Sequence, residues 1–224
     1  NEETGSFVYT AEKNGIKIDQ EKLASDILTQ VNAREFQAVI EASANEVAPD
    51  MTAAEAKEKY QVIGTYTTTT TANSDRNKNI ELASDAINGV IVQPGQEFSF
   101  NNTTGERSEA KGYRPAGAYV NGVLVEEPGG GVCQVSSTLY NAVVFSGLTT
   151  TERHAHSYEP SYVTPGEDAM VSFGGPDMKF VNNSPYAVAI RANFANRQLR
   201  ISIVGIPILE EGVTISMHSE KVAE

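Results

Sequence analysis

The residues best suited to covalent chemistry surround Cys133, the only cysteine of the chain. Three consecutive glycines, Gly129 to Gly131, precede it, and apolar residues then recur at helical spacing: Val132, Val135, Leu139 and Val143. We therefore expect a glycine turn that leads straight into a helix, with Cys133 in or beside its first turn. Unpaired backbone N–H groups and the positive end of the helix dipole stabilise a thiolate there, and the same groups can hold a developing oxyanion.

A purely structural cysteine is the alternative for this segment. Free cysteines are among the most buried residue types, so a lone cysteine after a glycine turn can serve packing alone. The three glycines in a row ahead of Cys133 favour the functional interpretation.

A cysteine nucleophile needs a base, and two of the three histidines, His154 and His156, follow about twenty residues downstream. On an extended segment, residues two apart face the same side, so both rings can approach Cys133 if the chain folds back. The third, His218, lies in a polar tail. Either histidine can also be an ordinary polar residue without a catalytic role.

Two further charged residues are candidates for the site. An imidazole that acts as a base is commonly oriented by a third group, and Asp168 is the candidate, although an aspartate at this position can equally belong to a turn. Arg153 can bind a substrate carboxylate as a two-pronged donor, or simply form a surface ion pair.

Other chemistries find weaker support. Cys133, His154 and His156 are ligand types of a zinc centre, but their spacing lacks the usual pattern, so we expect no metal and no other cofactor. The segment Ser108 to Lys111 matches the Ser-x-x-Lys of penicillin-binding enzymes without the other motifs of that class, which indicates coincidence.

Charge and composition exclude some partners. The 224 residues include 17 Lys and Arg against 29 Asp and Glu, a net charge of −12 that repels phosphate backbones, so nucleic acid is not an expected partner.

No run of about 18 apolar residues is present to span a bilayer. The sequence starts at Asn1 without a leader, and we expect a signal or anchor to precede it in the full-length protein. The oligomeric state is not indicated.

The periodicity predicts an α+β fold, mostly antiparallel sheet with a few packed helices, in which the cysteine helix packs at one end. The first part, to about residue 62, is predicted to contain strands at 7–10 and 36–40, a helix from Asp19, a linker at 44–50 and a helix opened by a capping box at Thr52 and Glu55. The second part is β-rich. Its threonine run at 67–71 is predicted to form a half-exposed strand, and further strands are predicted at 97–100, 168–173, 186–194 and 198–204. A hairpin turn at 195–197 is expected to join the last two strands, and a helix is predicted at 79–88.

The sequence resembles the VanW-type domain of bacterial envelope proteins over about residues 64 to 205. The resemblance rests most specifically on Gly129 to Ala142, and more weakly on Arg76, Asn79-Ile80, Asn88-Gly89, Pro94-Gly95, Phe98 to Asn101, Gly105, Gly112-Tyr113, Glu152-Arg153, His156-Ser157, Tyr162, Gly166 and Asp168-Ala169. It divides the chain into 1–62, similar to the end of a peptidoglycan-binding module, a VanW-like domain at 63–205 and a tail at 206–224.

The resemblance implies a location at the outer face of the membrane, anchored, in Gram-positive-type bacteria. It implies L,D-transpeptidase activity on peptidoglycan stem peptides, through a thioester on Cys133. It favours His156 over His154 as the base, because the Arg-x-x-His-Ser spacing ends on His156. It points to substrate-binding positions at Gly131, Gln134, Ser136, Arg153, His154 and Tyr162. A noncatalytic wall-binding or scaffolding module remains the alternative.

Overall fold

The computed structural model describes residues 8–120 and 123–221. The chain divides into two compact units, Asn1–Lys59 and Tyr60–Glu224. All strand pairs in the described residues are antiparallel, and helices accompany them in both units, so the predicted α+β class is confirmed. Within these residues no helix is both long and apolar enough to cross a membrane.

The first unit is built on a two-stranded sheet in which β1 (Gly15–Ile18) pairs with β2 (Ala44–Val47). Between them runs the predicted helix, α1 (Gln20–Asn32), whose first turn is capped by the Asp19 side chain. The helix α2 (Ala53–Lys59) follows. None of residues 8–59 is buried, so this unit contributes no core of its own in the described residues.

The capping box of α2 is confirmed. The Thr52 backbone N–H donates to Glu55 Oε2 at 2.8 Å, and the Glu55 N–H donates to Thr52 Oγ1 at 3.2 Å. The expected linker at 44–50 is wrong, since its first half is β2. Its partner lies almost thirty residues away, and such pairing leaves no local signal. The strands expected at 8–10 and 36–40 are absent, and residue 7 lies outside the described residues.

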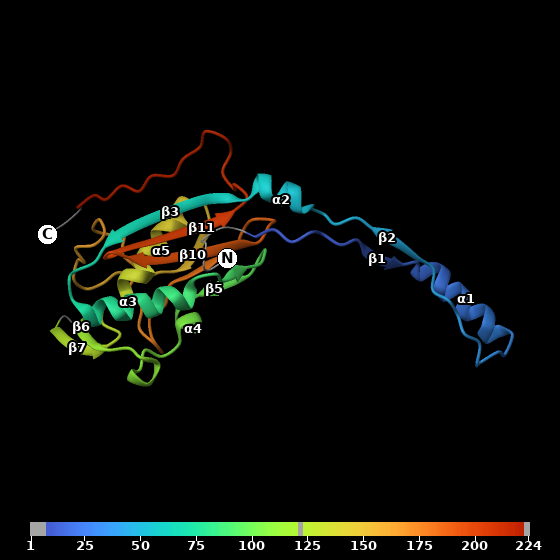
Figure 1. The fold of residues 1–224 in the computed structure, drawn as a ribbon, viewed down its shortest axis with the longest axis horizontal. Coiled ribbons are helices and arrows are strands. Elements are labelled where there is room, and N and C mark those ends of the chain that lie inside the picture. Colours follow the sequence, from blue (N-terminus) through green and yellow to red (C-terminus); the bar gives the residue numbers. More distant parts are fainter. Residues whose placement is uncertain (1–7, 121–122, 222–224) are drawn as a thin grey trace. The chain divides into compact units, whose positions relative to one another are not determined.

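The second unit is organised around a four-stranded sheet with the order β3 (Gln61–Thr69), β11 (Gln198–Gly205), β10 (Val188–Ala195) and β4 (Ile91–Val92). Figure 1 shows β3, β11 and β10 side by side. The predicted hairpin joins β10 to β11. Its two turn residues, Asn196 and Arg197, both have positive φ, as the tight turns between twisted strands require.

One face of this sheet is covered by helices. α3 (Ser74–Ile87) packs on β10, and α5 (Val132–Phe145) packs on β3 and β11. The threonine run shows the consequence, because Thr68 faces the helices with 3% exposure while Thr67 and Thr69 are exposed. The half-exposed strand predicted at 67–71 is confirmed for residues 67–69, which end β3.

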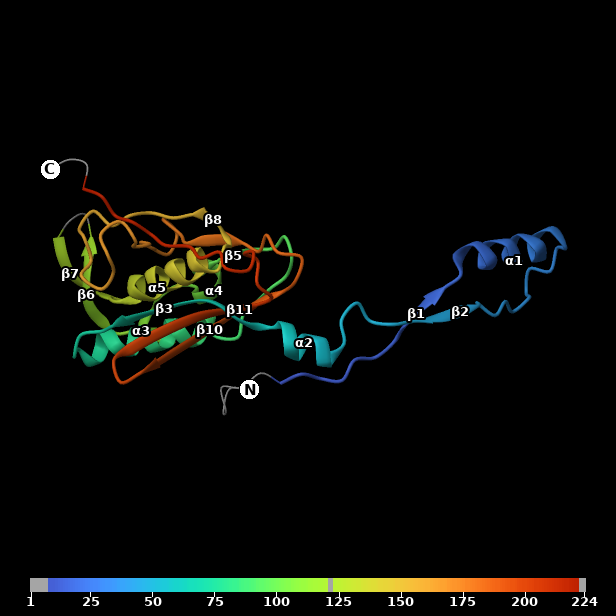
Figure 2. The same ribbon diagram turned by 90° about the horizontal axis from the view of Figure 1, so that it is seen from above.

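A second sheet of β5 (Glu97–Ser99), β9 (Lys179–Val181) and β8 (Thr149–Glu152) lies on the other side of α5 (Figure 2). α5 is therefore buried on most of its surface. Its buried residues are not all apolar, since five of them are polar: Gln134, Ser136, Ser137, Thr138 and Asn141. The expected strand at 168–173 is absent from the structure. These residues form no regular element, and Ala169 and Val171 accept hydrogen bonds from side chains of α5.

The remaining elements are α4 (Phe100–Thr104), a one-turn 3-10 helix at Glu109–Lys111 and a hairpin of β6 (Pro115–Val120) with β7 (Val123–Pro128). The sequence did not predict this hairpin, which leads directly into the glycine turn.

The close contact between α5 and β3 depends on Gly64. A Cβ at this position would lie 2.4 Å from the Ala142 carbonyl oxygen and 2.7 Å from the Ser146 nitrogen, both backbone atoms of the helix end. Neither can move without displacing α5.

Gly64→Ala is therefore expected to lower the free energy of unfolding by about 1–3 kcal/mol, the cost of overpacking a well-filled interior. Gly175→Ala is the matched control, because its Cβ would meet nothing nearer than 3.7 Å, and a change within about 0.5 kcal/mol is expected. Urea denaturation of both variants measures the difference. Equal stabilities would contradict the proposed contact.

Candidate functional site

Each of the three positions in the turn before α5 requires glycine for a structural reason of its own. Gly129 and Gly131 have φ of 91° and 104°, a conformation that side chains with a Cβ rarely adopt. Gly130 packs against β6, where a Cβ would lie 2.2 Å from the Ala116 carbonyl oxygen. The turn thus fixes where the helix begins.

α5 starts at Val132, and Cys133 is its second residue. The Val132 N–H donates to the Gly129 oxygen at 3.0 Å and the Gln134 N–H to the Gly131 oxygen at 2.9 Å. In the part of the chain that the structure describes, the backbone N–H of Cys133 has no acceptor. Of these three N–H groups, the one of Cys133 is therefore available to donate a hydrogen bond to an oxyanion.

The Cys133 thiol is partly buried and donates a hydrogen bond to the Val171 carbonyl oxygen at 3.3 Å. Burial favours the neutral thiol, but the hydrogen bond and charge of His156, with a further positive charge from Arg107, outweigh it and lower the pKa of Cys133. The thiol therefore sits in the electropositive surroundings typical of reactive cysteines.

His156 connects the thiol to a buried carboxylate. Its Nδ1 lies 2.5 Å from Asp168 Oδ2, and its backbone N–H donates to the same oxygen at 2.6 Å. Since Nδ1 faces Asp168, Nε2 is the nitrogen that serves Cys133. Burial of the ring opposes protonation, but the bonds to Asp168 and Cys133 raise the pKa of His156 to about 9. His156 is therefore an imidazolium at neutral pH, and its charge favours the thiolate form of Cys133.

Asp168 is 3% exposed, and Arg153 holds its other side. The Arg153 Nη2 donates to Asp168 Oδ1 at 2.9 Å and to the Gly166 carbonyl at 2.7 Å, while Nε donates to the Asp168 carbonyl at 2.6 Å. Burial would raise the pKa of Asp168, but the bonds from His156 lower it overall. Arg153 therefore positions the carboxylate, and the hydrogen bonds of its Nε and Nη2 go to the protein itself.

The structure gives His154 a different partner. Its Nε2 lies 3.0 Å from Glu152 Oε1 in an exposed pair, while the His156 side chain is only 14% exposed. The two rings do not share a partner because β8 ends at Glu152 and the following backbone is irregular. Among the described residues, no three His, Cys, Asp or Glu side chains are grouped so as to hold a metal ion.

Two residues expected to bind substrate are instead tied into the interior. Gln134 donates to Thr68 Oγ1 at 3.0 Å and to the Thr69 carbonyl at 3.1 Å, and Ser136 donates to the Ala169 carbonyl at 2.6 Å. Both are 1% exposed or less. They join α5 to β3 and to the segment that carries Asp168.

Tyr162 does lie near the thiol, hydrogen-bonded to Ser137. Burial, followed by the negative charge of Cys133, raises the pKa of Tyr162 above its usual value. It stays a neutral phenol that can donate a hydrogen bond.

Sequence reasoning assigned no role to two arginines that the structure places at the glycine turn. A Cβ on Gly131 would lie 2.7 Å from Arg76 Nη1, and one on Gly129 would lie 2.8 Å from Arg107 Cβ. The bare faces of these glycines are thus occupied by arginine side chains. No local pattern links residues so far apart, and Arg76 entered only through the family resemblance.

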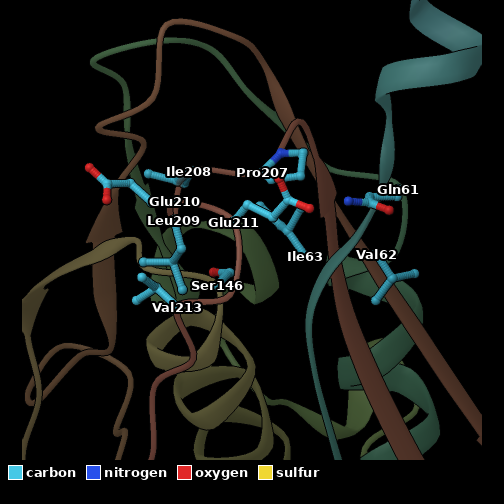
Figure 3. A pocket seen from close by; sticks show the side chains of 10 residues that line it. All are labelled: Gln61, Val62, Ile63, Ser146, Pro207, Ile208, Leu209, Glu210, Glu211 and Val213. Atoms are coloured by element: carbon cyan, nitrogen blue, oxygen red, sulfur yellow. The ribbon is translucent and has the colours of Figure 1, made fainter.

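A hollow of about 360 Å³ lies elsewhere in this unit (Figure 3). Its lining comes from the start of β3, from Ser146 and from residues 207–211 and 213. Ser146 follows the last residue of α5 and lies thirteen positions after Cys133, which is about 20 Å along the helix at 1.5 Å per residue. The hollow is not part of the cysteine site.

The role of His156 predicts a difference between two single substitutions. His156→Ala removes the cation beside the thiol, so the pH at which iodoacetamide begins to label Cys133 should rise by about one unit or more. His154→Ala is the matched control, because the His154 side chain pairs with Glu152, and the pH at which labelling begins should not change. Equal behaviour of the two variants, or labelling only after denaturation, would mean that His156 does not ionise the thiol.

Comparison with known proteins places this site in a family. Residues 75–204 match the family model described as "VanW like protein". The chain is 46% identical over 133 residues to the uncharacterized protein YoaR of Bacillus subtilis, covering 59% of this chain and 44% of that protein. It is 32% identical over 111 residues to the vancomycin B-type resistance protein VanW of Enterococcus faecalis, covering 47% and 40%. The matches thus span less than half of either relative, and no solved structure matches. The chain belongs to the VanW-like protein family.

Proposed function

We propose that this protein is a cysteine acyltransferase that acts on peptidoglycan stem peptides, in the manner of an L,D-transpeptidase. The observation that carries the proposal is the continuous chain from Cys133 through His156 to Asp168, at the start of a buried helix. Nucleophile, proton carrier and orienting group are the parts that acyl transfer needs.

In the acylation step, the Cys133 thiolate attacks the carbonyl carbon of the donor peptide. The carbonyl oxygen becomes an oxyanion that accepts a hydrogen bond from the free Cys133 N–H. When the carbon–nitrogen bond breaks, the leaving amine takes the proton of His156 Nε2. The product is a thioester beside a neutral imidazole.

The second step runs through the same groups in reverse. The amine of a second stem, or water, gives a proton to His156 Nε2 and attacks the thioester carbonyl. The carbon–sulfur bond breaks, and the sulfur leaves as a thiolate beside the re-formed imidazolium. An amine acceptor gives a cross-link, and water gives a trimmed stem. Asp168 keeps Nδ1 protonated and the ring oriented throughout.

The proposed substrate, peptidoglycan stem peptides, is inferred from the family relationship and not from the geometry of the site. One relative is named as a vancomycin B-type resistance protein. We extend the proposal to an extracytoplasmic, membrane-anchored protein at the cell wall, whose first unit is the end of a peptidoglycan-binding module. The competing account is a wall-binding scaffold in which the cysteine has no chemical role.

The proposal predicts a covalent intermediate. Incubation with tetrapeptide stems should add the tripeptide acyl group to Cys133 and release the terminal D-alanine, which intact-mass spectrometry detects. Cys133→Ala should remain folded, because a small apolar residue at this position removes little beyond the sulfur contacts, and should show no adduct. An adduct from pentapeptide stems alone would indicate D,D chemistry, while no adduct or product from several stem types with an added acceptor would favour the scaffold.

The pH dependence separates the two roles of the pair. His156 is protonated below its pKa of about 9, so acylation by a peptide, which needs that proton for the leaving amine, should decline as pH rises through about 9. Alkylation by iodoacetamide needs only the thiolate and should not decline there. Stopped-flow or quenched single-turnover rates measure both. A peptide acylation rate that keeps rising through this range would rule out His156 as the acid.

A further inference from the structure

Arg76 and Arg107 are partly buried cations that contact no carboxylate among the described residues, although the charge of Asp177 acts on Arg107 from farther away. Within the described residues, neither takes part in an ion pair, whereas the other partly buried arginine of the site, Arg153, pairs with Asp168. Buried charges in proteins are normally paired, because removal from water is costly. Two unpaired guanidinium groups beside a nucleophile therefore indicate that an anion binds there.

Arg107 is the one of the two with buried donors that lack a partner. Its Nη2 donates to Asn101 Oδ1 at 2.7 Å, and its guanidinium carbon lies 5.6 Å from the centre of the Phe100 ring. Its Nε and Nη1 have no hydrogen-bond partner and no contact with solvent. These unsatisfied donors are what an incoming carboxylate would satisfy, with a movement of the side chain to admit it.

Arg76 approaches the turn from α3. Its Nη2 donates to Gln134 Oε1 at 2.8 Å, which leaves Nη1 against the bare face of Gly131. Burial lowers the pKa of both arginines, and the negative charge of Cys133 opposes this shift in each. Both cations therefore lie at the turn that presents the thiol.

We propose that Arg76 and Arg107 form a carboxylate-binding subsite beside Cys133, which restricts the enzyme to donors whose scissile bond is the last peptide bond. In such a donor the leaving amine and the free carboxylate belong to the same terminal residue, two covalent bonds apart. When the thiolate attacks, that carboxylate must lie next to the sulfur. A bond inside a longer chain would place a neutral amide there. This reading of the donor rests on the proposed function, whereas the anion subsite itself does not.

Two alkylating reagents test the subsite without any peptide. Iodoacetate and iodoacetamide react with a thiolate in the same way, but only iodoacetate carries a carboxylate. We expect the ratio of their rates on Cys133 to exceed that on a free small thiol. Arg107→Gln and Arg76→Gln should each lower the ratio about tenfold, the loss of one charged hydrogen-bonded contact. Taking the ratio removes any change in the thiolate fraction.

The controls separate binding from general charge. Arg200→Gln removes the same charge from an exposed position on β11 and should leave the ratio unchanged, with all rates measured at about 0.15 M salt to screen distant charges. Arg107→Lys keeps a cation and should retain part of the preference, provided thermal melts show each variant folded. A ratio no higher than the free thiol, or unaffected by either glutamine variant, would overturn the subsite.

Matched peptide donors then test recognition of the substrate. A stem ending in free D-alanine should acylate Cys133 at least about tenfold faster than the same stem with a C-terminal carboxamide. Equal rates would overturn the inference and leave the acyltransferase proposal intact. If neither donor reacts, while the iodoacetate preference depends on Arg107, the anion subsite stands and the proposed function fails.

Discussion

The charged carboxylate of Asp168 is the constraint on which the site depends. It is almost completely buried, and such a charge is tolerated only when its oxygens are fully bonded. His156 supplies two of these bonds and Arg153 the third. The same bonds raise the pKa of the imidazole, which in turn lowers that of the thiol. The lowered pKa of Cys133 is therefore a consequence of how one acidic side chain is buried.

The helix that carries Cys133 is held by polar contacts as much as by apolar packing. Ser137 Oγ accepts from the Ala169 N–H at 2.9 Å, next to Asp168, and Asn141 reaches the Glu167 carbonyl at 2.8 Å. On the opposite side Gln134 binds the end of β3. These bonds connect Cys133 and Asp168 through the same helix, which fixes the position of both residues relative to each other.

Local pattern was enough to predict several elements of this fold. Helical spacing, capping residues and alternation identified α1, the capping box of α2 and the β10–β11 hairpin, because each signal lies within about fifteen residues. The β1–β2 pair and the extended run at 168–173 were assigned wrongly, since each depends on a partner distant in sequence. β8 and β9 are too short to show a period.

The same distinction between local signals and distant partners applies to the candidate site. The glycine turn and Cys133 are visible in the sequence because they are contiguous, and the resemblance singled out His156. Nothing local shows that Arg153 serves Asp168 or that Arg76 and Arg107 fill the space beside the glycines. Tertiary contacts alone assign those roles.

The state of His156 tests the central claim most directly. With three histidines in the chain, an NMR titration can follow each imidazole. The account predicts that His156 is an imidazolium at pH 7 and titrates near 9, and that Cys133→Ala lowers this pKa by removing the thiolate. A His156 that titrates near the ordinary value of about 6.5, unchanged by Cys133→Ala, would contradict it.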